Sequence, residues 1–203
     1  MARPLLTTAR LELRPLTADD SDLLVELDGD RAVMEFLSGR ETPPDEVIEV
    51  WMPQRTDPAH DALGLGYWSG FEEGEFVGWF CLTPTGDREA ELGYRLRQRA
   101  WGRGLASEGA LRLLEHGFAT ARLRRIWAET MAVNARSRAV LERVGLRQVR
   151  TDVRQWDDPL PGAELGEVVY ELTADEFDHT RNADPGQSPG GPARPTVRGT
   201  ERP

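Results

Sequence analysis

The sequence contains no lysine, so all 25 basic residues among its 203 are arginine. Cys81 is the only cysteine, which excludes a disulfide within the chain and is typical of a reducing compartment. His60, His116 and His179 lie far apart and form no ligand pattern, so we expect no metal site. No apolar run approaches the ~20 residues of a membrane span, and the N-terminus has no apolar signal core. These absences predict a cytoplasmic protein without a membrane segment.

The formal net charge of −10 argues against a nucleic-acid-binding protein. That charge is unevenly distributed. Between Arg95 and Arg150 lie 13 arginines, four glutamates and no aspartate, a net charge of +9, so the remainder carries −19. A basic segment in an acidic protein indicates a polyanionic ligand bound locally, although a solvated arginine-rich helix face gives the same pattern.

The length predicts one domain with a sizeable core, over residues 1–181. Residues 182–203 are rich in Pro, Gly, Ser and Arg and predict a disordered tail. Periodicity and turn signals predict an α/β protein with helices on both faces of a mixed sheet, and a loop over 54–64. The strands are expected at 8–15, 66–72, 75–82, 89–96, 125–133, 146–156 and 168–173. The helices are expected at 20–27, 43–52, 104–122, 134–145 and 174–180.

The turn from Trp101 to Ala106 lies between an expected strand and the longest expected helix. Strand, glycine turn and helix start direct backbone N–H groups and the positive end of a helix toward one spot. Such a spot binds phosphate. A glycine pair alone is a weak signal, and the motifs on either side strengthen it.

Three motifs follow one another along the chain. They are Glu91-x-Gly93-Tyr94, then Trp101 to Ala106 with Glu108, and then Asn134-x-x-Ser137 with Gly145-Leu146. In their order and spacing they resemble the GNAT superfamily of acetyl-coenzyme A-dependent N-acetyltransferases, and most closely the branch that acetylates ribosomal-protein N-termini. The resemblance spans Leu11 to Leu172. It implies an α/β (α+β) GNAT fold with a mixed, mostly antiparallel sheet of about six or seven strands.

The resemblance also implies which residues hold acetyl-coenzyme A. The family's pyrophosphate signature, Arg/Gln-x-x-Gly-x-Gly/Ala, fits in two frames, one starting at Arg99 and one at Trp101. We prefer the second frame, because only there does the continuation into Glu108 align. Backbone N–H groups from about Gly102 to Ser107 would then cradle the pyrophosphate. The cofactor-binding residues in this frame are Trp101, Gly102, Arg103, Gly104, Leu105 and Ala106.

In this fold the strand that contains Tyr94 and Leu96 diverges from its neighbour. The pantetheine arm lies in the gap. These two residues would therefore offer it free backbone groups, and the arm would pair with them as an added β-strand does. Asn134 would cap its helix and contact pantetheine. The side chains of Arg97, Arg99 and Arg103 are further candidates for attracting phosphate, or are solvated surface arginines.

Acetyl transfer requires a base for the attacking amine and benefits from a donor to the leaving thiolate. Glu91 and Glu129 rank equally as base, with Glu89 behind them. Many family members have a tyrosine as acid seven residues after the equivalent of Asn134. Here that position is Leu141, and Ser137 is the substitute found in the ribosomal-protein branch.

The expected acceptor is a primary amine, on a small molecule or a protein N-terminus, and the enzyme is expected to be a monomer or homodimer. Six aromatic residues are candidates for an apolar acceptor groove, although most tryptophans in a domain of this size belong to the core. They are Trp51, Tyr67, Trp68, Phe71, Trp79 and Trp156. The missing tyrosine at Leu141 also suggests an alternative, a non-catalytic binding or regulatory protein of the same fold. A dinucleotide-binding Rossmann domain is disfavoured, because the turn lacks the third glycine of Gly-x-Gly-x-x-Gly.

Overall fold

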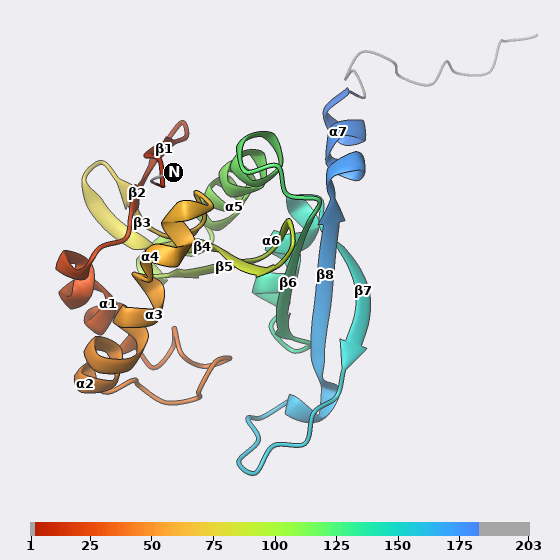
Figure 1. Ribbon diagram of the computed structural model, residues 1–203. Helices are drawn as coiled ribbons and strands as arrows, with labels where there is room; N and C mark the ends of the chain where they lie inside the picture. Colours follow the sequence, from red (N-terminus) through yellow and green to blue (C-terminus); the bar gives the residue numbers. More distant parts are fainter. Residues whose placement is uncertain (1–2, 183–203) are drawn as a thin grey trace, which may run out of the picture.

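A computed structural model describes residues 3–182, which form one eight-stranded sheet in the order β1-β2-β3-β4-β5-β6-β8-β7 (Figure 1). Every neighbouring pair is antiparallel except β5 and β6, which are parallel. The expectation of a mixed, mostly antiparallel sheet is confirmed, and the two-residue β1 accounts for its larger size. The strands are β1 Leu6–Thr7, β2 Leu11–Pro15, β3 Gly66–Glu72, β4 Glu75–Gly86, β5 Glu89–Leu96, β6 Arg125–Met131, β7 Arg147–Asp152 and β8 Glu167–Thr173.

The helices also follow the sequence pattern, with one exception. Residues 54–64, expected to be a loop, contain the end of α3 and the whole of α4. Pro58 begins α4, and the Asp57 side chain accepts a hydrogen bond from Ala59 N at 2.8 Å, a standard helix start. The α-helices are α1 Ser21–Asp28, α2 Pro44–Glu46, α3 Met52–Arg55, α4 Pro58–Ala62, α5 Leu105–Glu115, α6 Ala135–Arg143 and α7 Ala174–Asn182.

Two hydrophobic cores lie on opposite faces of the sheet. Helices α5 and α6 cover the larger core, which takes Leu92 and Leu96 from β5. Helix α1 and the π-helical turn Val47–Trp51 cover the smaller core, which contains Trp79 and Cys81 from β4. This arrangement follows from the alternation of side chains along a strand, which sends successive residues of β4 and β5 to opposite faces. Helices on both faces are thereby confirmed.

Two of the six aromatic candidates for an acceptor groove belong to the core, which was the alternative for them. Trp68 is completely buried in the larger core, and Trp79 is 7% exposed in the smaller one, so both are structural. Trp51 and Trp156 are exposed. The sequence could not separate these roles, because a tryptophan contributes to a core or to a binding surface with the same composition signal.

Helix α5 packs unusually close to the sheet. A Cβ added at Gly109 would lie 2.3 Å from Cε1 of Phe80 on β4, so only glycine allows this approach. The close packing fixes the start of α5 relative to the end of β5, across the turn between them. The glycine in the middle of this helix therefore serves the position of the turn.

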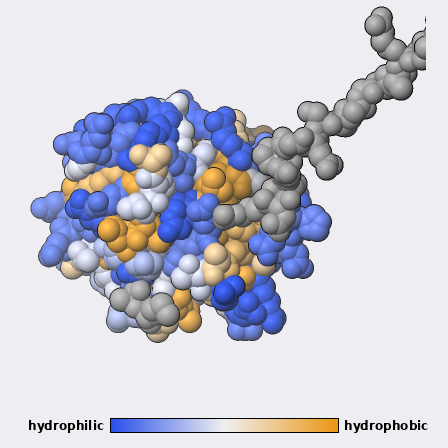
Figure 2. All heavy atoms as spheres, turned by 90° about the horizontal axis from the view of Figure 1, so that it is seen from above, coloured by the Kyte–Doolittle hydropathy of each residue, from blue (hydrophilic) through white to orange (hydrophobic). Residues whose placement is uncertain are grey.

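The tail expected at residues 182–203 lies outside the described residues, except for Asn182, which ends α7. Within residues 3–182 no helix is long and apolar enough to cross a membrane. The face shown in Figure 2 is largely hydrophilic, with separate apolar patches between hydrophilic side chains.

Candidate active site

The central strands β5 and β6 separate soon after they meet. Their parallel pairing covers only Glu89 with Arg125, Ala90 with Ile126 and Glu91 with Trp127. Beyond Glu91, β5 continues to pair with β4 as far as Leu96, but its other edge has no strand beside it in the described sheet. Backbone groups on such an edge are available to an extended ligand. The divergence expected for Tyr94 and Leu96 is therefore present.

The turn that follows β5 has the backbone expected of an anion cradle. Gly102 and Gly104 have φ of 70° and 82°, and Gly104 is the N-cap of α5. An added Cβ at Gly102 would meet nothing within 4 Å, so conformation rather than space requires glycine there. The first N–H groups of a helix lack intrahelical partners and carry its positive partial charge. Residues from Gly102 into the first turn of α5 therefore present N–H groups at one place.

Trp101 ties this turn to the end of β5. Its indole Nε1 donates a hydrogen bond to the Leu96 carbonyl at 2.8 Å, and its half-buried ring packs against both cores. A carbonyl oxygen has a second lone pair, so Leu96 retains some accepting capacity. Trp101 thus has a structural role at the position where the family signature has Arg or Gln.

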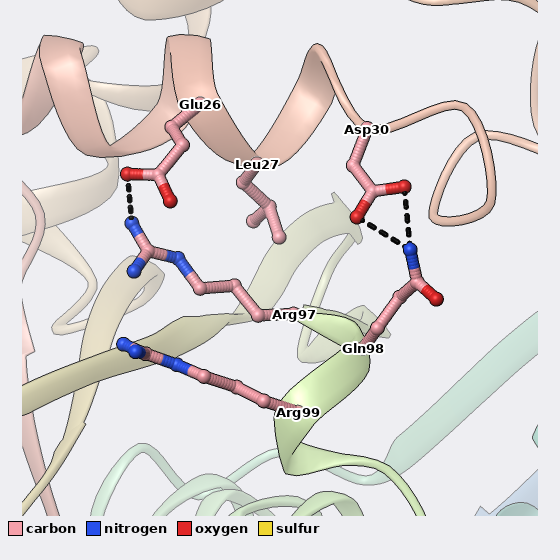
Figure 3. A pocket seen from close by; sticks show the side chains of 6 residues that line it. All are labelled: Glu26, Leu27, Asp30, Arg97, Gln98 and Arg99. Carbon is pink, nitrogen blue, oxygen red and sulfur yellow. Dashed lines mark hydrogen bonds and ion pairs between the residues drawn. The ribbon is translucent and has the colours of Figure 1, made fainter.

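The three arginines suggested for phosphate attraction are each paired with a carboxylate. Arg97 contacts Glu26 at 2.6 Å, Arg99 contacts Glu75 at 3.3 Å, and Arg103 contacts Glu72 at 2.8 Å. Figure 3 shows the pocket beside the first of these pairs, where the Gln98 amide also donates to both oxygens of Asp30, at 2.9 and 2.8 Å. The contacts of Arg97 and Gln98 hold the residues before the turn against α1 and Asp30, and those of Arg99 and Arg103 reach β4 and β3.

Arg136 is a residue that the sequence reasoning missed. It lies on the first turn of α6, is exposed, and places its guanidinium carbon 5.0 Å from the centre of the Trp101 ring. Across the described residues, no ion pair involves it. A positive charge without a carboxylate partner therefore stands over the turn. The sequence signal that could have identified Arg136 is its position two residues after Asn134, in the same motif.

Helix α6 begins opposite the open edge of β5. Asn134 Oδ1 accepts a hydrogen bond from Ser137 N at 3.1 Å, which confirms its role as a helix cap. The Tyr94 hydroxyl lies 3.2 Å from both the carbonyl oxygen and Oγ of Ser137. Burial raises the pKa of Tyr94 to about 12, against the opposing effect of the Ser137 hydrogen bond. Leu141 is 1% exposed and belongs to the larger core.

Three glutamates lie close to one another on the face of the sheet opposite Tyr94. They are Glu91 on β5, Glu129 on β6 and Glu167 on β8. Burial, and then the charge of Glu129, raises the pKa of Glu91. Glu129 accepts hydrogen bonds of 2.7 Å from both terminal nitrogens of Arg154. Burial and Glu129 also raise the pKa of Glu167, which Arg154 partly opposes.

These contacts separate the three base candidates. Glu129 is tied to Arg154, and Glu89 to Arg125 at 3.0 Å. No hydrogen bond or ion pair within residues 3–182 engages the Glu91 carboxylate. A raised pKa and no cationic partner are properties suited to proton abstraction near neutral pH.

Glu108, by contrast, is bound to its surroundings. It accepts hydrogen bonds from Thr8 Oγ1 at 2.5 Å, from Arg10 N at 2.9 Å and from Arg10 Nε at 2.7 Å. Burial would raise its pKa, but these hydrogen bonds lower it overall. These contacts give Glu108 a structural role at the start of α5. Within the described residues, no group of three or more His, Cys, Asp or Glu side chains is arranged to hold a metal ion, and the expected lack of a metal stays a prediction.

A groove of about 730 Å³ lies between the segments 30–39 and 160–161, beside Gln98. The two segments come together where a Cβ added at Gly39 would lie 2.4 Å from Cδ2 of Leu160. Gln98, which follows β5, forms part of the wall. The lining residues are Asp30, Arg31, Ala32, Glu35, Gly39, Gln98, Leu160 and Pro161.

Diverging central strands, a glycine turn and a capped α6 occur together in one family. The sequence model of the family described as acetyltransferase (GNAT) domain matches residues 10–147 of this chain. The chain belongs to the GNAT acetyltransferases. This confirms the family and fold expected from the sequence. GNAT enzymes transfer acetyl from acetyl-coenzyme A to an amine, so the chain is an acetyltransferase rather than a binding protein without catalysis.

A curated relative and two solved structures indicate the range of acceptors in the family. FsC-acetyl coenzyme A-N(2)-transacetylase of Aspergillus fumigatus is 39% identical over 188 residues, covering 87% of this chain and 79% of that protein. The RimL ribosomal L7/L12 alpha-N-protein acetyltransferase, solved with coenzyme A, has a TM-score of 0.71 at 20% identity, over 87% of this chain and 99% of that one. Spermidine N-acetyltransferase from Vibrio cholerae, solved with CoA and spermine, has a TM-score of 0.69 at 18% identity, over 84% of this chain and 99% of that one. These two structures show the shared fold.

Proposed function

We propose that this GNAT enzyme acetylates the α-amino nitrogen of an amino-acid-derived small molecule. The observation that carries the proposal is the 39% identity with a transacetylase named for the N(2) position of its acceptor. In amino-acid numbering, N2 is the nitrogen next to the carboxyl-bearing carbon. The similarity to that enzyme is much higher than to the ribosomal-protein and spermidine enzymes, at 20% and 18% identity.

In this proposal the acceptor binds in the groove beside Gln98, and the size of that groove suits a small molecule. Its volume of about 730 Å³ falls within the ~300–1,000 Å³ typical of small-molecule sites. The contact between Gly39 and Leu160 bridges the groove, whereas a protein N-terminus needs a channel open along the length of a chain. The groove carries both charge signs, through Asp30, Glu35 and Arg31, which suits an acceptor with an amine and oxygen-bearing groups.

Acetyl-coenzyme A supplies a thioester whose carbonyl carbon the amine attacks. The N–H groups from Gly102 into α5 suit its pyrophosphate, and the open edge of β5 at Tyr94 and Leu96 suits the pantetheine amides. The charge of Arg136, over Trp101, adds to the attraction for phosphate. Asn134 lies at the start of α6, opposite this edge, where its cap also orders Ser137.

Glu91 is the base in this proposal. The α-amine of a peptide or an amino-acid ester has a pKa of about 8, against about 10.4 for a lysine-type amine, so near neutral pH it loses its proton with less assistance. Glu91 accepts the amine proton as the C–N bond forms. A free N–H on the open edge of β5 donates to the carbonyl oxygen as it gains charge. The C–S bond then breaks, and the thiolate leaves beside Ser137.

The experiment is release of free thiol from acetyl-coenzyme A in the presence of three acceptor classes at equal concentration. These are α-amines of amino acids and their esters, spermidine, and short peptides with free N-termini. We expect kcat/KM to be highest for the first class, with the product acetylated at the α-nitrogen by mass spectrometry. Preference for spermidine or for peptides would overturn the assignment of the acceptor.

A further inference from the structure

The contact between Tyr94 and Ser137 joins the open edge of β5 to the first turn of α6. The phenol oxygen lies 3.2 Å from Ser137 Oγ and 3.2 Å from the Ser137 carbonyl oxygen. Both residues are half-buried, so the pair stands at the wall of the gap instead of inside the core. A tyrosine hydroxyl therefore reaches α6 from a strand, whereas Leu141, on α6 itself, has only methyl groups in the larger core.

We propose that Tyr94 is a positioning residue, which holds the Ser137 hydroxyl as the hydrogen-bond donor to the departing thiolate. This inference rests on the proposed function, because it requires the thioester sulfur to lie beside Ser137. It assigns a role to the Tyr94 side chain, where the sequence suggested only a role for its backbone.

A serine hydroxyl alone is a poorly directed donor. Its single proton rotates among acceptors, and in α6 the nearby backbone carbonyls compete for it. The phenol has one proton and two acceptors at 3.2 Å, the Ser137 carbonyl oxygen and Ser137 Oγ. In the proposed arrangement it donates to Oγ, so the serine oxygen already has a donor and its own proton points away from the phenol. Hydrogen bonds in such a chain also strengthen one another. The pair therefore makes a better donor toward the sulfur than Ser137 does by itself.

The ionisation of Tyr94 fits donation without proton loss. Its pKa of about 12, raised by burial, keeps the phenol protonated throughout the working range. A thiol of the cysteine type has a pKa near 8.5, so a thiolate does not remove the proton of so weak an acid. The electron pair of the C–S bond stays on sulfur, Ser137 donates a hydrogen bond to it, and water later supplies the proton. The amine proton goes to Glu91.

Tyr170 provides a matched control on the same helix. It lies on β8, and its hydroxyl donates to Glu142 at 2.8 Å and accepts from Arg138 Nε at 3.1 Å. Both partners are on α6, but neither is Ser137. Tyr170→Phe therefore removes a comparable link between sheet and helix without touching the proposed donor.

The test measures the thiol pKa of bound coenzyme A by the ultraviolet absorption of its thiolate, in the wild-type enzyme and in Tyr94→Phe, Ser137→Ala, the double variant and Tyr170→Phe. We expect the bound thiol to be more acidic than free coenzyme A. Tyr94→Phe and Ser137→Ala should each raise this pKa and lower kcat about tenfold, the size of one hydrogen bond. The double variant should be no worse than Ser137→Ala, and Tyr170→Phe should change neither quantity.

Two results would overturn the inference. One is equal loss of kcat in Tyr94→Phe and Tyr170→Phe with an unchanged thiol pKa, since this marks Tyr94 as a link that merely holds α6. The other is full additivity of Tyr94→Phe and Ser137→Ala. If Tyr94→Phe fails to fold, 3-fluorotyrosine at position 94 replaces it, and its stronger donor should lower the thiol pKa further. Failure of wild-type protein to bind coenzyme A in calorimetry would instead reject the proposed function itself.

Discussion

The turn from Trp101 to Ala106 and the cluster of three glutamates, Glu91, Glu129 and Glu167, are built in opposite ways. The turn consists of six consecutive residues, Trp101 to Ala106, and its properties come from backbone conformation and a helix start. The carboxylates come from β5, β6 and β8, and their properties come from whichever side chains lie opposite them. A site of the first kind can be recognised from local sequence. A site of the second kind acquires its chemistry only when the sheet assembles.

The sharpest test of the carboxylate side is Glu91→Gln, which removes the proposed base and keeps the shape of the side chain. We expect kcat/KM for the amine to fall by about 10²–10⁴-fold, the usual contribution of general base catalysis. Affinity for acetyl-coenzyme A, measured by calorimetry, should stay unchanged. In the wild type, activity requires ionised Glu91, so it should fall on the acid side, at a pH above the ordinary pKa of glutamate. A loss of less than threefold would remove Glu91 from the mechanism.

The turn is tested by Gly104→Ala, because Gly104 has φ of 82° and an alanine in this region costs about 1–2 kcal/mol. We expect affinity for coenzyme A to fall about tenfold, as the N–H groups lose their arrangement. Gly74→Ala is the matched control. Gly74, in the β3–β4 hairpin, has φ of 84°, and a Cβ added there would meet nothing within 4 Å. Alanine at position 74 therefore introduces the same backbone strain at a place remote from the site. Equal affinity losses in both variants would point to general destabilisation.

A smaller loss of cofactor affinity is expected for Arg136→Ala. The exposed guanidinium is screened by solvent, so we expect coenzyme A to bind about threefold to tenfold more weakly, with a reduced dependence on salt. Arg143→Ala, at the other end of α6, serves as control and should leave affinity unchanged. Binding of pantetheine, which lacks the nucleotide phosphates, should not respond to either change. If it does, Arg136 acts through Trp101 and not through phosphate.

The smallest effect should come from Glu129→Gln, which tests the neighbour of the base. The negative charge of Glu129 contributes to the raised pKa of Glu91. Its removal should lower that pKa and move the acid limb of the pH–rate profile to lower pH, by a fraction of a unit. The plateau of kcat should be unchanged. Abolished activity would make Glu129 the base and Glu91 the neighbour.

The sequence predicted most of what is local. The strand Glu89–Leu96 and the Asn134 cap have the expected places. The strands expected at 66–72 and 75–82 form a hairpin whose turn lies between them, at Glu73 and Gly74. The failure to predict α4 also has a local cause. Asp57 and Pro58 form a helix start, but the loop-like composition of the segment obscured it.

Contacts between distant segments were beyond prediction. Nothing in the pattern indicates that Arg154, in the loop before β8, binds Glu129, or that the Tyr94 hydroxyl reaches Ser137. Each contact depends on the distance between elements, which only packing determines. For this reason the two glutamates ranked equally in sequence and differ in the structure. The same reason explains why Arg136 was missed while the carboxylate-paired Arg97 and Arg103 were considered.

The short parallel ladder between β5 and β6 also affects the motion of the sheet. Three residue pairs hold the two halves together at this line, whereas β4 and β5 pair along almost the whole of β5. In the free enzyme the sheet should therefore open most easily at this seam, and amide hydrogens of β6 near it should exchange faster than those of β4. Coenzyme A bound in the gap would bridge the seam, so slower exchange on both sides is expected to accompany binding. In the proposed binding mode the cofactor would act as a missing strand, and part of its affinity would depend on the stiffness that it gives the sheet.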